Sequence, residues 1–163
     1  MGVAMRIRSL TPAPRAWLAV VACIAVILIF SGDEFSARST SQILWPLLRW
    51  LFPEVPYARL HAIHLWVRKG AHVTEYAVLG LLAFRALRLS LAISLPRTAL
   101  LGLAVVLAVA ATDELRQSLL ASRTGSIIDV GFDLAGGALG VCLVIAAHRA
   151  AGIGAPTSAE RRG

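Results

Sequence analysis

Apolar residues along the chain fall into four long runs, each bounded or interrupted by charged positions. These runs cover residues 16–32, 70–89, 97–112 and 127–148. A single helix needs about 20 mostly apolar residues to cross the hydrocarbon of a bilayer, and each run approaches that length. A helix also satisfies its backbone polar groups within one segment, as a lipid environment requires. The pattern predicts an all-α membrane protein, a bundle of about four transmembrane helices.

The stretch between the first and second runs, residues 42–67, has a different character. It places Trp45, Trp50, Tyr57 and Trp66 among polar residues. Aromatic side chains of this kind are enriched where a membrane meets water. We expect this stretch to form an interfacial or re-entrant amphipathic segment between helices one and two.

The amino-acid composition supports a membrane protein and argues against a soluble domain, a nucleic-acid-binding protein and a disulfide-bonded or zinc-binding protein. The 163 residues are 58% hydrophobic, above the roughly 45–50% of soluble domains. The net charge of +7 comes from arginines scattered at the ends of the apolar runs, without the basic stripe that binds nucleic acid.

Cys23 and Cys142 lie inside apolar runs, so neither a disulfide framework nor a zinc site is indicated. Asp33 and Glu34 follow the first run where a signal peptide would have small residues, so we expect that run to be retained.

The charged residues are unevenly divided between the two ends of the expected helices. Short loops rich in Lys and Arg stay in the cytoplasm, and nine basic residues fall on one side: Arg6, Arg8, Arg15, Arg85, Arg88, Arg97, Arg149, Arg161 and Arg162. Seven fall on the other side: Arg38, Arg49, Arg59, Arg68, Lys69, Arg116 and Arg123. Most acids share this second side: Asp33, Glu34, Glu54, Glu75, Asp113, Glu114, Asp129 and Asp133. Both termini are therefore expected to be cytoplasmic, with the acids toward the outer leaflet.

Polar residues within the second run repeat at helical spacing. Lys69, His72, Tyr76 and Gly80 are separated by three, four and four positions, which places them on one helix face. A charged side chain at bilayer depth costs at least ~2.5 kcal/mol and usually faces a partner or an aqueous cavity. This face is expected to point into the bundle.

The fourth run shows the same periodicity. Asp129, Asp133, Gly136 and Gly140 are separated by four, three and four positions, so two carboxylates lie above a seam of small residues that also includes Gly137. The spacing of Gly136 and Gly140 is the GxxxG pattern that allows membrane helices to approach closely. The second helix, with its own Gly80, is the expected neighbour.

The end of the third run and the connection after it complete a polar set. Glu114 and Gln117 share a helix face, Asp113 lies within one turn of Gln117, and Arg123 follows as a cation for a carboxylate or an anionic head group. We expect one outward-facing pocket with this ligand-binding set: Lys69, His72, Glu75, Tyr76, Glu114, Gln117, Arg123, Asp129 and Asp133.

Simpler readings remain open for parts of this set. His72 and Glu75 are also explained as a buried polar pair that fixes helix register. Asp129 with Arg123 is also explained as a structural ion pair at a helix start. His61 and His64 are three positions apart without a third ligand, so no metal and no cofactor are expected there.

These motifs together resemble the VanZ-like family. The resemblance covers residues 68–140. The segment "RKGAHVTEYAVLG" matches the family pattern K-x-x-H-x-x-x-Y-x-x-x-G, and "DELRQ" matches E-x-x-Q. Arg123 matches an Arg that follows, and "DVGFDLAGGALG" matches D-x-x-x-N-x-x-G-x-x-x-G except at one position. Asp133 stands where the pattern has Asn, and "ASR" stands where Pro-Gly-Arg is common. The first difference adds a carboxylate beside Asp129.

The resemblance implies a domain plan and a location. Together with the distribution of Lys and Arg, it implies a basic cytoplasmic N-terminus at 1–15, one VanZ-like transmembrane domain at 16–148, and a cytoplasmic, disordered tail at 149–163. It also implies a multi-pass protein of the bacterial cytoplasmic membrane with a role in the cell envelope. The family is named for resistance to the glycopeptide teicoplanin, which makes antibiotic resistance a consequence to consider.

Two classes of function fit these residues. The first is a protein that binds a membrane lipid or lipid-linked envelope precursor, or another anionic envelope ligand, in the pocket. The second is a membrane-embedded enzyme that modifies such a lipid or glycan by acid–base chemistry, with His72, Glu114 and Asp129 as candidate catalytic residues. The sequence contains no nucleophile elbow and no HExxH motif, which favours the binding protein.

Overall fold

The computed structural model describes residues 12–32, 37–119 and 126–150, and all of its regular structure is helical. Five helices follow one another along the chain: α1 (Pro12–Phe30), α2 (Ala37–Leu51), α3 (Tyr57–Ser90), α4 (Leu95–Ser118) and α5 (Ile127–Ala150). The predicted all-α fold is confirmed, including the short helix between the first two long ones. Residues before Pro12 and after Ala150, where the N-terminal segment and most of the tail were predicted, lie outside the described residues.

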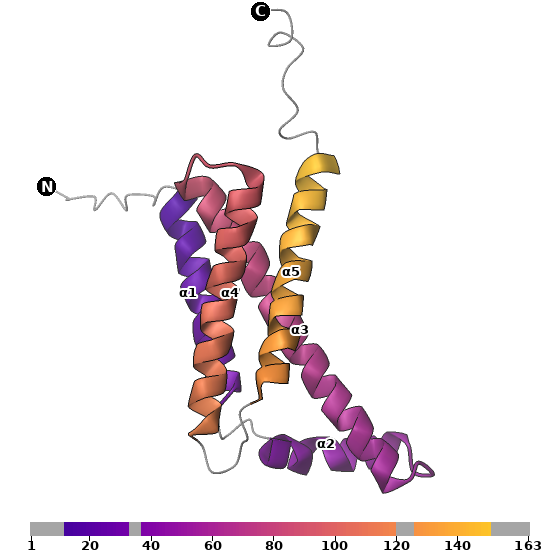
Figure 1. Cartoon of the computed structure of the whole chain (residues 1–163). Coiled ribbons are helices and arrows are strands. Elements are labelled where there is room, and N and C mark those ends of the chain that lie inside the picture. The colour runs from indigo at the N-terminus through magenta and orange to yellow at the C-terminus, as the bar shows by residue number, and fades with distance from the viewer. Residues whose placement is uncertain (1–11, 33–36, 120–125, 151–163) are drawn as a thin grey trace, which may run out of the picture.

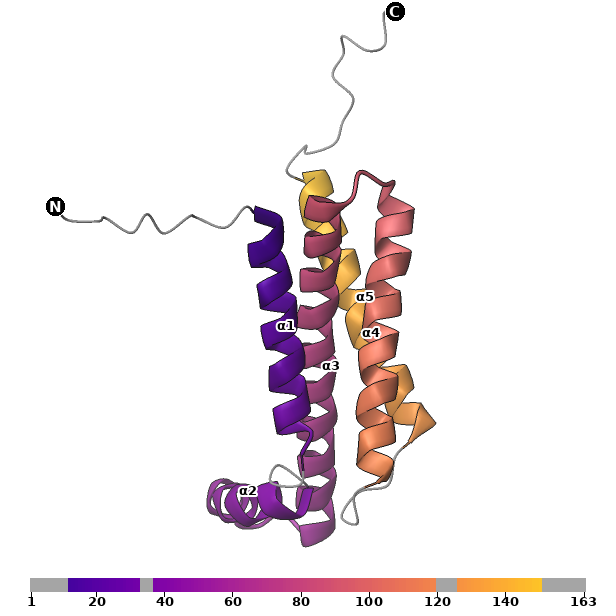
Figure 2. The ribbon, with the colours of Figure 1, turned by 90° about the vertical axis from the view of Figure 1, so that its left-hand side faces the viewer.

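The four long helices run alongside one another and α2 lies across one end of them (Figures 1 and 2). Successive long helices alternate in direction, so the start of α1 and the end of α5 lie at the same end of the bundle (Figure 1). Helix α3 is central, because it contacts all four other helices and packs most extensively against α5.

Three helices, α1, α4 and α5, are long and apolar enough to cross a membrane. Their outer faces expose large apolar side chains such as Val21 on α1, Leu100 on α4 and Leu143 on α5, the surface that lipid tails solvate. Helix α3 carries more charge, but Tyr76, Leu79, Ala83 and Phe84 are fully buried within it. The run 70–89, which is apolar but carries polar residues, is therefore covered by its neighbours in its central part.

The second long helix begins much earlier than residue 70. Pro53 and Pro56 separate α2 from α3, and after Pro56 the chain continues as one helix for 34 residues. The stretch 42–67 is thus two elements rather than one, because no proline or glycine interrupts the chain between Tyr57 and Lys69.

Aromatic contacts hold the corner between α2 and α3. The ring of Trp45 stacks on Tyr57 with 5.5 Å between centroids, and the Arg49 guanidinium lies 4.5 Å from the centre of the same Tyr57 ring. Arg49 also donates a hydrogen bond of 2.9 Å to the carbonyl oxygen of Val55. Trp50 and Trp66 remain exposed at this end, where the sequence predicts an aromatic interfacial belt.

Small residues bring α3 and α5 into backbone contact. A Cβ atom added at Gly136 would collide with the backbone of Val73, and one at Gly140 with the backbone of Ala77. A Cβ atom at Gly80 would collide with the Gly137 carbonyl. Only glycine leaves room for this approach, which sets α5 against α3 and positions the acidic start of α5 beside the polar face of α3.

Candidate functional site

A polar cavity lies among α3, α4 and α5, at the end of the bundle where α4 stops and α5 starts. Its volume is about 140 Å³. Seven of its nine lining residues are polar or charged, and they come from all three helices: Leu65, Arg68, Lys69, His72, Glu114, Gln117, Asp129, Phe132 and Asp133. Such a lining is unusual within an apolar helical bundle and marks the cavity as the candidate site.

Two contacts between a basic and an acidic side chain cross this cavity between α3 and α5. Lys69 Nζ lies 2.5 Å from Asp129 Oδ1, and the same ammonium lies 4.5 Å from the centre of the Phe132 ring. One turn further along, His72 Nδ1 lies 3.8 Å from Asp133 Oδ1, beyond hydrogen-bond length. The four-residue spacing of the aspartates matches the spacing of the basic residues closely enough for two successive pairs.

Glu114 connects α4 to the start of α5. Its Oε2 atom accepts a hydrogen bond of 2.6 Å from the backbone N–H of Ser126, immediately before α5 begins. A free N–H at a helix start is one of the groups that intrahelical bonds leave unsatisfied. The carboxylate therefore both lines the cavity and fixes the entry into α5.

Asp113 faces a different set of partners. Its side chain is fully buried and accepts hydrogen bonds from Ser31 at 2.5 Å and Gln117 at 2.7 Å. Arg116 donates to Asp113 at 3.3 Å and to the Leu28 carbonyl at 2.6 Å. Asp113 thus joins α4 to the end of α1 instead of lining the cavity, and Gln117 belongs to both groups.

Tyr76 and Glu75 lie beside the cavity without lining it. The Tyr76 ring is fully buried, and its hydroxyl has no hydrogen-bond partner in the part of the chain that the structure describes. Four carboxylates act electrostatically on that hydroxyl: Glu75, Asp113, Glu114 and Asp133. Glu75 itself interacts electrostatically with Cys23 of α1, Asp113 of α4 and Arg68 of α3.

The structure brings together six of the nine residues expected in the pocket: Lys69, His72, Glu114, Gln117, Asp129 and Asp133. Glu75 and Tyr76 lie next to them, and Arg123 lies outside the described residues. His72 Nδ1 lies 3.8 Å from Asp133 Oδ1, and the pairing of His72 with Glu75 as a register device stays a prediction. That these residues bind a ligand stays a prediction.

Sequence reasoning missed three lining residues and one network. Arg68 precedes His72 by one turn, Leu65 precedes Lys69 by one turn, and Phe132 follows Asp129 by three residues, so helical spacing alone could have found them. The hydrogen bond between Ser31 and Asp113 could not be predicted from the sequence, because a serine at the end of an apolar run has many possible partners.

No cluster of three or more potential metal ligands occurs among residues 12–32, 37–119 and 126–150. His61 instead lies beside Trp45, with 6.4 Å between ring centroids, and His64 is buried. His61 thus contributes to the packing of the α2–α3 corner.

Three apolar spans, a charged central helix and a polar cavity between helices at one end of the bundle define a multi-pass membrane protein. The chain belongs to the VanZ/LLP1 family, whose model matches residues 16–148. The resemblance seen in the sequence motifs is thereby confirmed. No curated protein and no solved structure gives a significant match to this chain.

Proposed function

We propose that this protein binds the polar head group of a membrane lipid or lipid-linked envelope precursor in the cavity among α3, α4 and α5. The observation that carries the proposal is the lining: seven polar or charged side chains from three helices surround one space. Interhelical hydrogen bonds in membranes are worth only about 0.6–1.7 kcal/mol each. Holding three helices together does not by itself require so many ionisable groups.

The size of the cavity supports a head group rather than a whole molecule. At about 140 Å³, it is smaller than the roughly 300–1,000 Å³ of pockets that enclose a drug-sized ligand. A lipid or lipid-linked precursor fits this limit, since its polar part enters while its chains remain among the apolar outer faces of the helices.

The charges of the lining specify the chemistry of that head group. Arg68 and Lys69 offer donors to an anionic group such as a phosphate. Glu114, Asp129 and Asp133 offer acceptors to hydroxyl or ammonium groups. A simple anion would meet these three carboxylates at close range. We therefore favour a head group that combines a phosphate with hydroxyl or amino groups, as lipid-linked glycans do.

The expected orientation places the cavity on the outer side of the bacterial cytoplasmic membrane. Arg85, Arg88 and Arg97 cluster around the α3–α4 connection at the opposite end from the cavity, and such clusters stay in the cytoplasm. A contribution to teicoplanin resistance would then follow from sequestering an envelope precursor.

The proposal is tested by purifying the protein in nanodiscs with bacterial lipid extract and identifying retained species by native mass spectrometry. His72→Ala and Glu114→Gln should each reduce the retained species at least about tenfold, the loss expected for one charge-assisted hydrogen bond of about 1.5–3 kcal/mol. His61→Ala and Glu54→Gln are matched controls, because neither residue lines the cavity, and they should retain it. Equal retention by all four variants would contradict the proposal.

The contact between His72 and Asp133 supports a second candidate function. A carboxylate 3.8 Å from an imidazole can orient the ring as a general base once a substrate closes the site. The same experiment separates the two functions: a binding protein retains its ligand unchanged over hours, whereas an enzyme generates a second species of different mass.

A further inference from the structure

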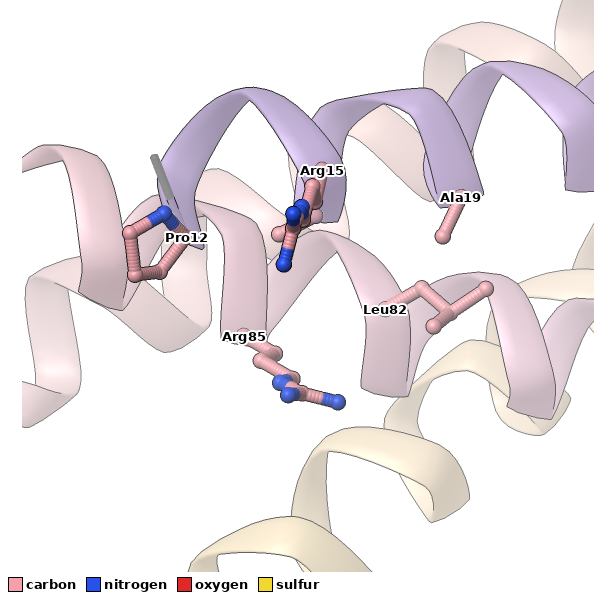
Figure 3. Close-up of a pocket in the computed structure, with 6 residues that line it drawn as sticks. Pro12, Arg15, Ala19, Leu82 and Arg85 are labelled. Carbon is pink, nitrogen blue, oxygen red and sulfur yellow. The ribbon is translucent and has the colours of Figure 1, made fainter. Parts of the chain in front are cut away.

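A second cavity lies at the opposite end of the bundle, between the start of α1 and the last third of α3. Its volume is about 330 Å³, and it is lined by Pro12, Arg15, Ala16, Ala19, Leu82 and Arg85. Figure 3 shows Arg15 from α1 and Arg85 from α3 on its two walls, with Ala19 and Leu82 further along the helices. One part of this space is therefore cationic and the other part is apolar.

The two arginines have no neutralising partner in the described part of the chain. Neither Arg15 nor Arg85 takes part in an ion pair or hydrogen bond there. Along α3 the nearest acidic residue is Glu75, ten residues before Arg85, which is about 15 Å at the rise of an α-helix. Two guanidinium groups that share one space repel each other, and an anion between them removes this cost.

We propose that this cavity binds the phosphate of an anionic phospholipid head group, with an acyl chain lying along Ala16, Ala19 and Leu82. A guanidinium fork matches phosphate oxygens in two parallel hydrogen bonds. Small side chains on α1 leave a furrow beside α3, and a lipid presents both a phosphate and a chain that fills such a furrow. Basic pockets between membrane helices on the cytoplasmic side bind anionic head groups in this manner.

This site is independent of the polar cavity at the other end. It shares no lining residue with that cavity, and its two charged residues are both arginine, whereas the other cavity combines both signs. Binding of phospholipid here anchors α1 against α3 in one leaflet. This binding does not require the envelope precursor proposed for the polar cavity.

The test is a titration of the detergent-purified protein with phosphatidylglycerol, followed by native mass spectrometry. Phosphatidylcholine with the same acyl chains and inorganic phosphate form the other two arms. We expect one tightly retained phosphatidylglycerol. We expect the double variant R15Q/R85Q to bind it about thirtyfold more weakly, from the contribution of two basic residues at a membrane surface.

The matched control is R97Q/R149Q, which removes the same charge from the same end of the bundle. All four arginines are exposed, but neither Arg97 nor Arg149 lines the cavity, so the affinity should change less than about threefold. If the double variant does not fold, R15Q and R85Q separately should each weaken binding about fivefold.

Three outcomes would overturn the proposal. Equal weakening in R97Q/R149Q would show general attraction by the basic end. Equal retention of phosphatidylcholine, whose phosphate is balanced by the choline ammonium, would show that the net negative charge of the head group is not recognised. Displacement of phosphatidylglycerol by millimolar inorganic phosphate would show an anion site without a lipid component.

Discussion

Ser31, in the turn that follows α1, donates a 2.5 Å hydrogen bond to Asp113 Oδ2 near the end of α4, 82 positions later in the chain. The carboxylate is fully buried and also accepts from Gln117. This contact explains how an acid is accommodated within an apolar bundle: its oxygens accept hydrogen bonds from the turn after α1 and from α4 itself. It also joins α1 to α4, which are otherwise connected mainly through α3.

Removing the Asp113 carboxylate should destabilise the protein. Asp113→Ala removes an acceptor shared by Ser31, Gln117 and Arg116 and leaves the Arg116 guanidinium without its carboxylate, and we expect a loss of about 3 kcal/mol in unfolding free energy. Ser31→Ala should cost about 1 kcal/mol. Thermal unfolding in detergent measures both. Ser118→Ala is the control, since its hydroxyl bonds only the Leu115 carbonyl of its own helix, and a cost as large as that of Ser31→Ala would contradict the assignment.

The close contact of α3 and α5 predicts different outcomes for two glycines of the same helix. Gly140→Ala places a methyl group into the backbone of Ala77 and should cost about 1–3 kcal/mol or more as an overpacked site. Gly131→Ala meets open space and should raise stability by up to about 1 kcal/mol through helix propensity. The measurement is the melting temperature of each variant, and similar melting temperatures would argue against the close backbone contact of α3 and α5.

The buried hydroxyl of Tyr76 should be dispensable for folding. It has no hydrogen-bond partner among the described residues, and a buried unpaired polar group costs about 1–3 kcal/mol. Tyr76→Phe should therefore leave the unfolding free energy unchanged or raise it by about 1 kcal/mol. The measurement is denaturant unfolding in mixed micelles, and a clear loss of stability would rule out an unpaired hydroxyl.

The orientation predicted from the arginines is tested by reporter fusions. A fusion after Ala92, in the α3–α4 connection, should be fluorescent with a cytoplasmic green reporter and inactive with alkaline phosphatase. A fusion after Leu119, where α4 has ended, should give the reverse result. The same outcome at both sites would contradict a membrane-spanning α4, and exchange of the two results would invert the orientation.

The proposed envelope role predicts a cellular phenotype for the cavity. If expression of the protein raises teicoplanin tolerance, His72→Ala, Glu114→Gln and Arg123→Ala should each abolish that gain. Glu54→Gln, in the exposed α2–α3 connection, should preserve it. Membrane abundance, measured by immunoblot, must be equal across the variants. Loss of insertion in all three variants would instead indicate that these residues only stabilise the bundle.

The sequence by itself determined the all-helical class, the apolar spans and much of the polar cavity. Helical periodicity is a local property, so the spacing of Lys69 and His72 on one helix, and of Asp129 and Asp133 on another, already placed each pair on a single face. The GxxxG pattern likewise indicated which face of α5 approaches a neighbour. Apolar segment length then set the number of long helices, although not the early start of α3.

The tertiary structure alone decided which faces meet. Periodicity does not tell that Lys69 pairs with Asp129, that Asp113 turns toward Ser31 while Glu114 turns toward Ser126, or that Arg15 and Arg85 share one space. These relations depend on the rotation and distance of helices that are remote in sequence. For α3 and α5 those quantities are fixed by how the two helices interlock at their glycines. For the other pairs they depend on the packing of the whole bundle rather than on any one helix.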